Sequence, residues 1–496
     1  MKLGRVLESG LLAGPLAEAA AELDVWGLEY DSRKVTAGCL FFAYAGAKVD
    51  GRRFAQDAID KGAVAVVSEL EAPEGFSGVW VRVTHGRRAM GMACRNLYGA
   101  AEEYFDLTGV TGTNGKTTTA FLIDALQRHG GAKTALLGTI GNWVAGSFEA
   151  VANTTALFVD VYGVLRKLRE AGGKRVTMEV SSHGLALDRT YGLAFHTAVF
   201  TNLSQDHLDF HTGGMEEYFE AKCKLFAGNG AAAPEWAAIN FDDEYGQRIV
   251  PAAGTKVLTY GRKAGACVRA EDVETGFDGL RFRLVYEGRS VAVRSPMVGE
   301  INVYNILAAS AAGISYGMEL EMIAEAVADF AAVPGRFERV DEGQPFLVIV
   351  DYAHTPDALR NAIDAARSLR PARVITLFGC GGDRDRTKRP LMGMAASEQS
   401  DFVVLTSDNP RSEDPLDIIN DAMVGLRRFD TPHIVEADRA RAIRMALAEA
   451  RPGDCLLIAG KGHEDYQVLR DQTVHFDDRE TARAILQEFG YRKGKG

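Results

Sequence analysis

A glycine-rich stretch followed by a lysine and threonines constrains the fold of this chain more than any other feature. Residues 112–118 read Gly-Thr-Asn-Gly-Lys-Thr-Thr and follow an apolar, strand-like segment that ends at Val110. Apolar residues then return at helical spacing between Phe121 and Leu126. The order of strand, glycine loop and helix predicts a phosphate-binding loop at the N-terminus of a helix.

The residue types in this stretch suit a nucleotide. Backbone N–H groups of such a loop can surround phosphate oxygens, Lys116 can reach the terminal phosphates and the Thr117 hydroxyl can bind magnesium. The spacing departs from the standard P-loop, because Val110 stands where the first glycine would fall. We interpret it as a shorter variant that binds ATP; an ordinary glycine turn before a helix is the alternative.

Composition narrows the classes of protein. A length of 496 residues with 47% hydrophobic content favours about three globular domains. The six cysteines form no Cys-x-x-Cys pair, which argues against a zinc ribbon or a disulfide framework and fits a reducing cytoplasm. A net charge of −11 without a long basic run argues against the binding of nucleic acid. We also expect no signal peptide and no membrane span, because the sequence lacks the apolar runs that these segments need.

The pattern along the chain predicts an α/β protein with three domains. Residues 1–100 form a small α/β unit, with strands near 39–44, 64–67 and 79–83 and a helix over 52–61. Residues 101–334 form the nucleotide domain, with a parallel-rich sheet, and the turn at Pro334-Gly335 marks the next boundary. Within the nucleotide domain, the alternating pattern predicts an antiparallel hairpin over 256–294, and residues 299–305 open an alanine-rich helix.

Two strands of the nucleotide domain end in residues that suit magnesium. The strand 176–180 contains Glu179, and a strand over 197–202 leads to His207. Asp209 and His211 give His207 the spacing of a metal cluster, but a transition-metal site needs more ligands. Lys222 has the pattern of a lysine on a helix surface.

Residues 335–496 alternate strand and helix regularly. Short apolar runs at 346–350, 374–378, 402–405 and 455–459 predict a parallel, doubly wound, Rossmann-like sheet. Ligands of such sheets gather beyond the carboxyl ends of the strands, so the loops after these strands should share one edge. In these loops, Arg411 and Glu464 would suit the carboxylate and the ammonium of a zwitterion.

An ATP site between two polar modules favours a reaction that joins two molecules. Phosphoryl transfer from ATP makes a carboxylate into an acyl phosphate, which an amine can attack. A P-loop kinase is the competing interpretation, and it leaves the C-terminal loops without a role. A non-enzymatic ATP-dependent binding module is a further alternative.

Four motifs together resemble the Mur ligases of peptidoglycan synthesis. They are Gly-Thr-Asn-Gly-Lys-Thr-Thr at 112–118, Met-Glu-Val-Ser-Ser-His-Gly at 178–184, Thr-Asn-Leu-Ser-Gln-Asp-His-Leu-Asp at 201–209 and Asp-Tyr-Ala-His-Thr-Pro-Asp at 351–357. The Asp-Asn-Pro-Arg loop at 408–411 resembles that of the members that add meso-diaminopimelate to UDP-N-acetylmuramoyl-L-alanyl-D-glutamate. The resemblance implies a cytoplasmic enzyme, a monomer, with ATP and Mg²⁺ and a carbamate on Lys222.

The resemblance also implies site residues, group by group. Those expected around ATP are Gly112, Thr113, Asn114, Gly115, Lys116, Thr117, Thr118, Asn302, Asn305, Arg336, Asp351 and His354. Those expected around magnesium are Thr117, Glu179, His207 and the carbamylated Lys222, and the catalytic set is Lys116, Glu179, His207, Lys222 and Arg336. Those expected around the UDP-muramoyl-peptide are Tyr30, Ser32, Ala47, Lys48, Val49, Asn153, Thr154, Thr155, Ser181, Leu187 and Arg189. Those expected around diaminopimelate are Arg384, Asp408, Asn409, Pro410, Arg411, Gly460 and Glu464.

The chain departs from the family pattern in the muramoyl-peptide region. Leu187 stands where a relative has glutamine, Tyr30 replaces an aliphatic residue, and the uridine turn reads Ala47-Lys48-Val49. Within the family, a lysine-adding ligase and a folate-type polyglutamate ligase are the alternatives. The N-terminal module argues against the folate type.

Overall fold

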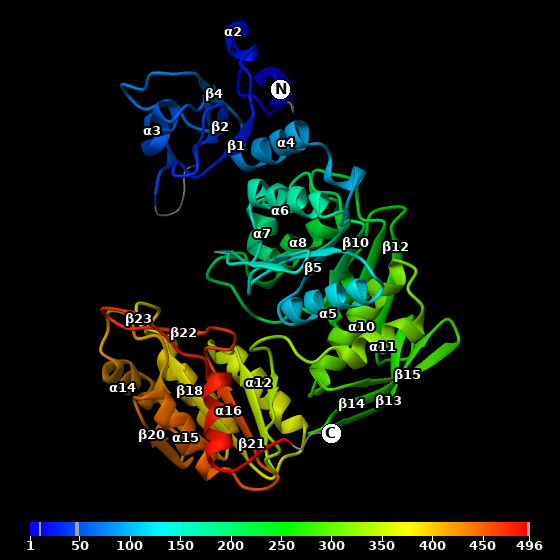
Figure 1. Cartoon of the computed structure of the whole chain (residues 1–496), viewed down its shortest axis with the longest axis vertical. Coiled ribbons are helices and arrows are strands. Elements are labelled where there is room, and N and C mark those ends of the chain that lie inside the picture. The colour runs from blue at the N-terminus through cyan, green and yellow to red at the C-terminus, as the bar shows by residue number, and fades with distance from the viewer. Residues whose placement is uncertain (9–10, 45–48, 152, 494–496) are drawn as a thin grey trace. The chain divides into compact units, whose positions relative to one another are not determined.

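The computed structural model describes residues 1–8, 11–44, 49–151 and 153–493 (Figure 1). Contacts divide the chain into two compact units, Met1–Arg269 with Leu307–Ile323, and Ala270–Ile306 with Ala324–Gly496. Each unit is described by itself below. Within the described ranges, no helix combines the length and the apolar character that a membrane crossing requires.

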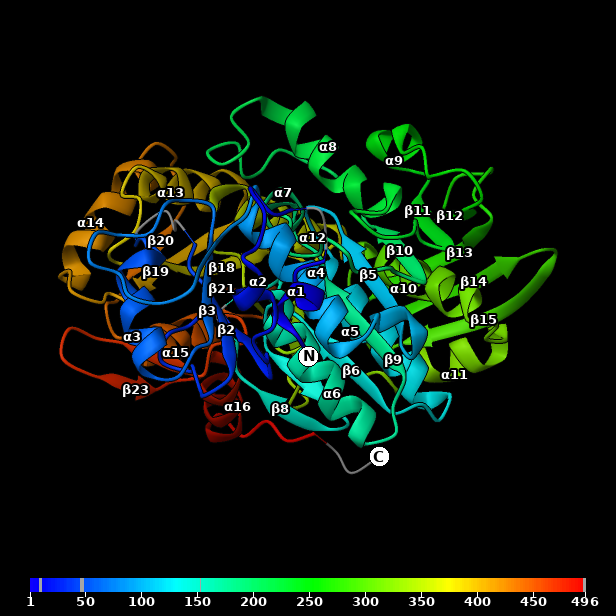
Figure 2. The same cartoon turned by 90° about the horizontal axis from the view of Figure 1, so that it is seen from above.

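The N-terminal part of the first unit is a small parallel sheet. Its strands lie in the order β1 (Gly27–Glu29), β2 (Cys39–Phe42), β3 (Ala65–Ser68) and β4 (Trp80–Arg82). The expected strands are confirmed, and the expected helix begins as a 3₁₀ turn before α3 (Ala55–Asp60). The other helices of this part are α1 (Leu3–Val6), α2 (Glu18–Ala21) and α4 (Gly86–Tyr98). Helix α4 packs on α6 (Phe158–Glu170) of the following sheet (Figure 1 and Figure 2).

The larger sheet of the first unit places the glycine loop at its centre. Strand β5 (Asp106–Thr111) lies between β10 (Thr197–Phe200) and β9 (Arg175–Glu179), parallel to both. The order continues outward through β11 (Trp236–Asn240) to β12 (Lys256–Gly261), and on the other side through β6 (Thr134–Leu137) to the edge strands β7 (Asn142–Val144) and β8 (Ser147–Glu149). Because β5, β9 and β10 are neighbours, the loops at their carboxyl ends meet. The associated helices are α5 (Lys116–His129), α6, α7 (Ser182–Ala186), α8 (Gly214–Ala227) and α9 (Glu244–Arg248).

The expectation of one hairpin over 256–294 is only partly correct. Strands β14 (Gly279–Tyr286) and β15 (Arg289–Ser295) are antiparallel, and Leu284 pairs with Val291 as the alternation predicts. Strand β12, at the start of this span, instead pairs in parallel with β11. Strand β13 (Val268–Gly276) lies between β12 and β14 in the sequence, and α10 (Glu300–Ser315) and α11 (Leu320–Asp329) follow β15.

The last part of the second unit is the doubly wound sheet that the sequence predicts. Its order is β16 (Glu338–Val340), β17 (Leu347–Asp351), β21 (Cys455–Ala459), β18 (Val374–Cys380), β19 (Phe402–Ser407) and β20 (His433–Val435), and β17, β21, β18 and β19 are parallel. Side chains alternate along β17: Leu347 and Ile349 join one apolar cluster, and Val348 joins the other.

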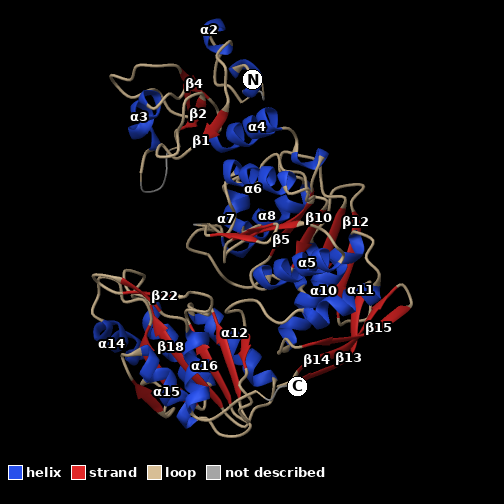
Figure 3. Ribbon diagram, in the orientation of Figure 1, coloured by secondary structure: helices blue, strands red, loops and turns tan. Residues whose placement is uncertain are grey.

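Helices cover both faces of this sheet (Figure 3). The first cluster contains residues of α12 (Pro356–Ser368), α13 (Lys388–Gln399) and α14 (Pro415–Leu426), and the second contains residues of α15 (Arg439–Glu449) and α16 (Asp478–Glu488). A short hairpin of β22 (Tyr466–Val468) and β23 (Thr473–His475) follows β21. After β18 the chain enters α13, which belongs to the first cluster, and after β20 it enters α15, which belongs to the second cluster on the opposite face. The loops after β18, β19 and β21 therefore lie at a switch point, where such sheets bind ligands.

Candidate active site

The glycine loop is held in place by its neighbouring strands. Gly115 has a φ of 83°, a left-handed conformation that glycine adopts readily, and α5 begins at the next residue. The side chain of Asn202, just beyond β10, accepts a hydrogen bond from the Asn114 N–H at 2.9 Å and donates to its carbonyl at 3.1 Å. The loop is therefore shaped before any phosphate binds.

Glu179, at the end of β9, lies directly beside the loop as expected. Its carboxylate accepts a hydrogen bond from the Thr117 hydroxyl at 2.9 Å and from the Thr139 N–H at 2.8 Å. The Glu179 side chain is buried. Hydroxyl and carboxylate oxygens are ligands that Mg²⁺ accepts, and Mg²⁺ commonly uses one or two carboxylates with substrate phosphates and water. The pair of Thr117 and Glu179 fits such an ion; Thr139 was not anticipated, because only the fold brings it to Glu179.

Lys222 is buried, so its interpretation as a surface lysine is wrong. Its Nζ donates to the Gly112 carbonyl at 2.8 Å and lies 4.4 Å from the centre of the Tyr218 ring. Burial, and then the charge of Lys116, lower the pKa of Lys222 well below its usual value. Such a shift favours the neutral amine, which is the form that reacts with carbon dioxide.

His207 lies near the loop, but the histidines around it do not form a metal cluster. Burial lowers the pKa of His207, with smaller effects from Asp206, Lys116 and Lys222. His211 is buried, and among the described residues neither ring nitrogen makes a hydrogen bond, although Nδ1 lies 3.9 Å from a Glu217 oxygen. Among the described residues, no group of three or more His, Cys, Asp or Glu side chains could hold a metal ion.

Most residues expected around the muramoyl-peptide gather at the end of β9. The Thr155 and Ser181 hydroxyls are 3.0 Å apart, and Arg189 donates to the Thr155 carbonyl at 3.0 Å. Thr154 accepts a hydrogen bond from the Thr139 hydroxyl at 3.1 Å. In the part of the chain that the structure describes, the Nε of Arg189 is buried without a hydrogen-bond partner, which suits a ligand oxygen. Leu187 caps α7.

The residues expected around the uridine nucleotide are only partly described. Ala47 and Lys48 lie outside the described residues, and Val49 is exposed. Ser32 is buried, while the Tyr30 hydroxyl donates to Asp160 of α6 at 2.6 Å. Tyr30 thus joins the N-terminal sheet to the larger sheet, and this contact explains why an aromatic residue can stand there.

In the second unit, the residues expected near ATP lie just before β16, at and after the end of β17, and on α10. The Arg336 guanidinium lies 4.9 Å from the Tyr352 ring, and its Nε is buried without a hydrogen-bond partner among the described residues. Asp351 accepts hydrogen bonds from the Phe337 N–H at 2.7 Å and the Ala353 N–H at 2.9 Å. Burial raises the pKa of Asp351. On α10, buried Asn305 donates to Asn302 at 2.9 Å, and His354 is exposed.

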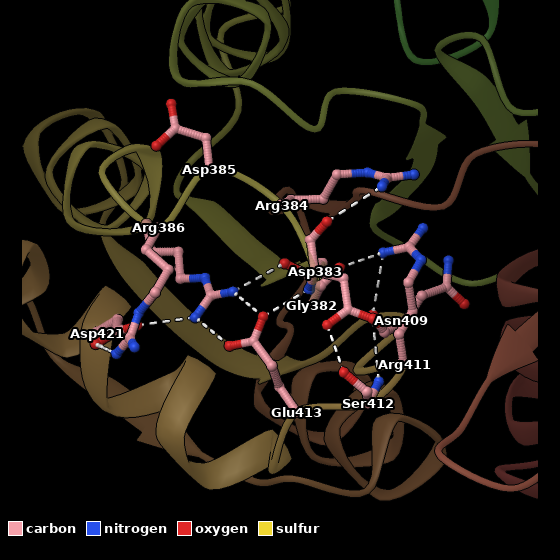
Figure 4. A network of polar contacts seen from close by, with 12 residues as sticks. Gly382, Asp383, Arg384, Asp385, Arg386, Asn409, Arg411, Ser412, Glu413 and Asp421 are labelled. Carbon is pink, nitrogen blue, oxygen red and sulfur yellow. Dashed lines mark hydrogen bonds and ion pairs between the residues drawn. The ribbon is translucent and has the colours of Figure 1, made fainter. Parts of the chain in front are cut away.

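The loops after β18, β19 and β21 meet as predicted, and Figure 4 shows the first two of them. Asn409 donates to Glu464 at 2.8 Å, and Arg411 donates through Nη1 to the Gly382 carbonyl at 2.7 Å. Arg384 donates to the Asp383 carbonyl at 3.2 Å. Arg411 is therefore held by main-chain oxygen, and Glu464 stands on the adjoining loop.

Lys461 supports this cluster of loop residues and was not anticipated. It is fully buried, and its Nζ lies 3.2 Å from Glu464 and 3.4 Å from the Asn409 side-chain oxygen. Lys461 thereby links the loop after β21, which carries Glu464, to the loop after β19, which carries Asn409. A lysine between two glycines gives no sequence signal of such burial.

The fold and these loops define a three-domain α/β protein with a P-loop and a second cluster of polar loop residues. Models of three domain families match the chain. They are "Mur ligase family, catalytic domain" at residues 24–98, "Mur ligase middle domain" at residues 110–313 and "Mur ligase, glutamate ligase domain" at residues 335–462. The chain belongs to the Mur ligase family.

Three of the similar proteins share one description. A relative from Solibacter usitatus, UDP-N-acetylmuramoyl-L-alanyl-D-glutamate--2,6-diaminopimelate ligase, is 57% identical over 99% of this chain and all of its own. A protein of the same description from Geobacillus thermodenitrificans is 45% identical over 98% of this chain and all of its own. A solved structure so described has 34% identity and a TM-score of 0.71, covering 99% of each chain.

Proposed function

We propose that this protein joins meso-diaminopimelate to UDP-N-acetylmuramoyl-L-alanyl-D-glutamate at the expense of ATP, in the synthesis of peptidoglycan precursors. The observation that carries the proposal is the cluster of polar residues that places Arg411 and Glu464 on adjoining loops at the sheet's switch point. An arginine held by the Gly382 carbonyl suits the distal carboxylate of diaminopimelate, which lysine lacks. The 57% identity to a ligase of this description supports the same activity.

The first chemical step is phosphoryl transfer from ATP to the γ-carboxylate of the D-glutamyl residue. The N–H groups of residues 112–118 and the Lys116 ammonium would bind and orient the phosphates. Thr117 and Glu179, with His207 and Lys222, would hold Mg²⁺, which neutralises charge on the transferring group. Arg189, Thr155 and Ser181 would position the muramoyl-peptide at the end of β9.

The second step is attack by an amine of diaminopimelate on the acyl phosphate. The new amide bond forms as the acyl–oxygen bond to phosphate breaks, phosphate leaves, and the neutral amine loses one proton and keeps the other as the amide N–H. Arg411 would fix the distal carboxylate and Glu464 an ammonium, so that the reacting amine is oriented. Asn302, Asn305, Arg336, Asp351 and His354 are assigned to the nucleotide.

We assign a carbamate to Lys222. A neutral amine forms an N–C bond to carbon dioxide and releases a proton, and burial of Lys222 favours that neutral form. The resulting carboxylate could join Glu179 in holding the cation. We further infer that the enzyme acts as a monomer in the cytoplasm.

Phosphate release tests the proposed reaction. The purified protein is given ATP, Mg²⁺ and the UDP-muramoyl-dipeptide, with meso-diaminopimelate or L-lysine, and the product mass is measured. Turnover only with diaminopimelate, with an amide product, is expected. Equal turnover with lysine would remove the role of Arg411 in specificity, and a phosphorylated product without amide would favour a kinase.

A further inference from the structure

The segments after β18 and β19 run side by side and hold each other through main-chain atoms (Figure 4). The Gly382 N–H donates to the Asn409 carbonyl at 2.9 Å. In return, the Gly382 carbonyl accepts from Nη1 of Arg411 at 2.7 Å. The direction of one carbonyl group, that of Gly382, therefore sets where the Arg411 guanidinium lies.

An ion pair fixes the segment that contains this carbonyl. Arg389, buried on α13, donates to the two oxygens of Glu413 at 2.7 and 2.9 Å, which is the two-point geometry of a strong pair. The same Glu413 accepts a hydrogen bond from the Asp383 N–H at 2.6 Å. Glu413 thus connects a buried cation to the residue next to Gly382.

A second pair of hydrogen bonds joins Asp383, in the segment after β18, to the segment after β19. The Asp383 carboxylate accepts from the Ser412 hydroxyl at 2.6 Å and from the Ser412 N–H at 3.3 Å. Asp383 and Glu413 therefore bind across the two segments in both directions. Because the peptide group between Gly382 and Asp383 is planar, fixing the Asp383 N–H also fixes the Gly382 carbonyl.

Arg411 keeps donors for a ligand after these contacts are made. Within the described part of the chain, its hydrogen bonds run from Nη1 to the carbonyls of Gly382 and Asn409. Nη2 and Nε remain for a carboxylate, and a planar guanidinium can bind a carboxylate at two points only if its plane is correctly set.

We infer that Arg389 and Glu413 are positioning residues that set the plane of Arg411 for the distal carboxylate of diaminopimelate. This inference rests on the proposed function. The pair acts through the Asp383 N–H and the Gly382 carbonyl and is not assigned any contact with substrate.

The neighbouring Asp421 supplies a matched control. It lies 2.8 Å from the same Arg389 nitrogen and has nearly the same side-chain exposure as Glu413, 26% against 24%. Asp421 also forms an ion pair with Arg386, which lies further along the segment after β18. Asp421 makes no described hydrogen bond to Asp383 or Gly382, so its loss removes an ion pair of Arg389 without releasing the carbonyl.

The experiment compares Glu413→Ala, Glu413→Gln and Asp421→Asn by kcat and KM for each substrate. For Glu413→Ala we expect KM for diaminopimelate to rise about tenfold or more, and the preference for diaminopimelate over lysine to fall by a similar factor, as expected for a misplaced charged hydrogen bond. KM for ATP should stay within about twofold. Glu413→Gln keeps an acceptor for Asp383 and should lie between the wild type and Glu413→Ala.

The outcomes separate this inference from the proposed function. A wild-type protein without diaminopimelate-dependent phosphate release overturns both, before any variant is compared. If the wild type is active but Glu413→Ala and Asp421→Asn raise KM for diaminopimelate equally, or if Glu413→Ala raises KM for ATP as much, the positioning role is wrong. If Glu413→Ala does not fold, Glu413→Gln is held to the same comparison with Asp421→Asn.

Discussion

Two buried lysines, Lys222 and Lys461, are each held by oxygen atoms of other residues. The pairing of Thr117 with Glu179 could be expected, because both follow neighbouring strands. The burial of Lys222 and Lys461 could not, since their ammonium groups contact the Gly112 carbonyl and the Asn409 side-chain oxygen, which lie 110 and 52 residues away in the sequence. The resemblance to a family, and not the local pattern, singled out Lys222.

Replacing Arg411 by alanine tests the specificity pocket directly. We expect kcat/KM for diaminopimelate to fall roughly 10- to 100-fold, the effect of losing a charged hydrogen bond, while KM for ATP changes little. The measurement is phosphate release with diaminopimelate and with lysine. An equal loss for both amino acids would contradict the assignment of Arg411 to the distal carboxylate.

Lys222→Ala should abolish turnover, because the amine that would form the carbamate is removed. Added bicarbonate should not restore activity, since alanine has no nitrogen to accept carbon dioxide. Steady-state phosphate release measures this, with Lys224→Ala on the same helix as the comparison. Near-normal turnover in Lys222→Ala would show that the lysine has only a packing role.

His463 should make the second unit sensitive to acid. Burial, with the charges of Arg336 and Arg479, lowers its pKa to about 4 from 6.5. The unfolded chain then binds the proton more tightly, so stability is fully present above pH 6.5 and is lost as pH falls toward 4. The loss should be on the order of 3 kcal/mol for the full shift.

Urea unfolding at pH 7 and pH 4.5 checks this expectation. His463→Phe should lose less stability than the wild type over that range, while His433→Phe, at an exposed position, should follow the wild type. A wild-type loss that His463→Phe does not reduce would assign the acid sensitivity to other groups.

At the scale of elements, the strands of the C-terminal sheet were predictable and the pairing of others was not. Runs buried on both faces, such as 374–378, are β-rich and nearly free of polar residues, so they stand out. The exposed three-residue strands β20, β22 and β23 have no such pattern. For β12, apolar residues marked a strand but could not show whether its partner ran parallel or antiparallel.

Helices α13 and α14 approach closely where glycine replaces a side chain, and this gives a test at the same scale. A Cβ at Gly393 of α13 would overlap the Ala422 carbonyl of α14, whereas a Cβ at Gly163 of α6 would meet open space. Gly393→Ala should therefore destabilise by about 1–3 kcal/mol through overpacking. Gly163→Ala should stabilise by roughly 0.5–1 kcal/mol, because alanine is the better helix former.

Denaturant unfolding of the two glycine variants measures the difference. Far-UV circular dichroism of each folded variant confirms that the helices are retained. Stabilisation by Gly393→Ala would mean that the two helices separate at no cost.

At the scale of the whole molecule, the described contacts show how the N-terminal module is fastened. Buried Asp188 accepts a hydrogen bond from Arg88 of α4 at 2.8 Å and lies 3.5 Å from Lys224 of α8. His85 approaches the same carboxylate at 3.3 Å. One acidic side chain beside Arg189 thus joins two modules, while the expected boundaries at 100/101 and 334/335 stay predictions.

Asp188→Asn should loosen this attachment. Removing the charge leaves cations facing a buried amide, which should cost roughly 1–3 kcal/mol. We expect earlier trypsin cleavage between the modules and a higher KM for the UDP-muramoyl-dipeptide. Asp124→Asn, which breaks an ion pair to Arg128 within one helix, should change neither.

The close contact between Gly381 and Arg411 bears on how amino-acid preference can be transferred between relatives. A Cβ at Gly381 would lie 3.0 Å from Nη1 of the arginine, tighter than an ordinary contact. Under the role that we propose for Arg411, the preference depends on an absent methyl group on one loop as well as on a charge on another. A graft of Asp-Asn-Pro-Arg into a lysine-adding scaffold therefore has to bring the glycine loop with it, and the two loops form the smallest portable unit of specificity.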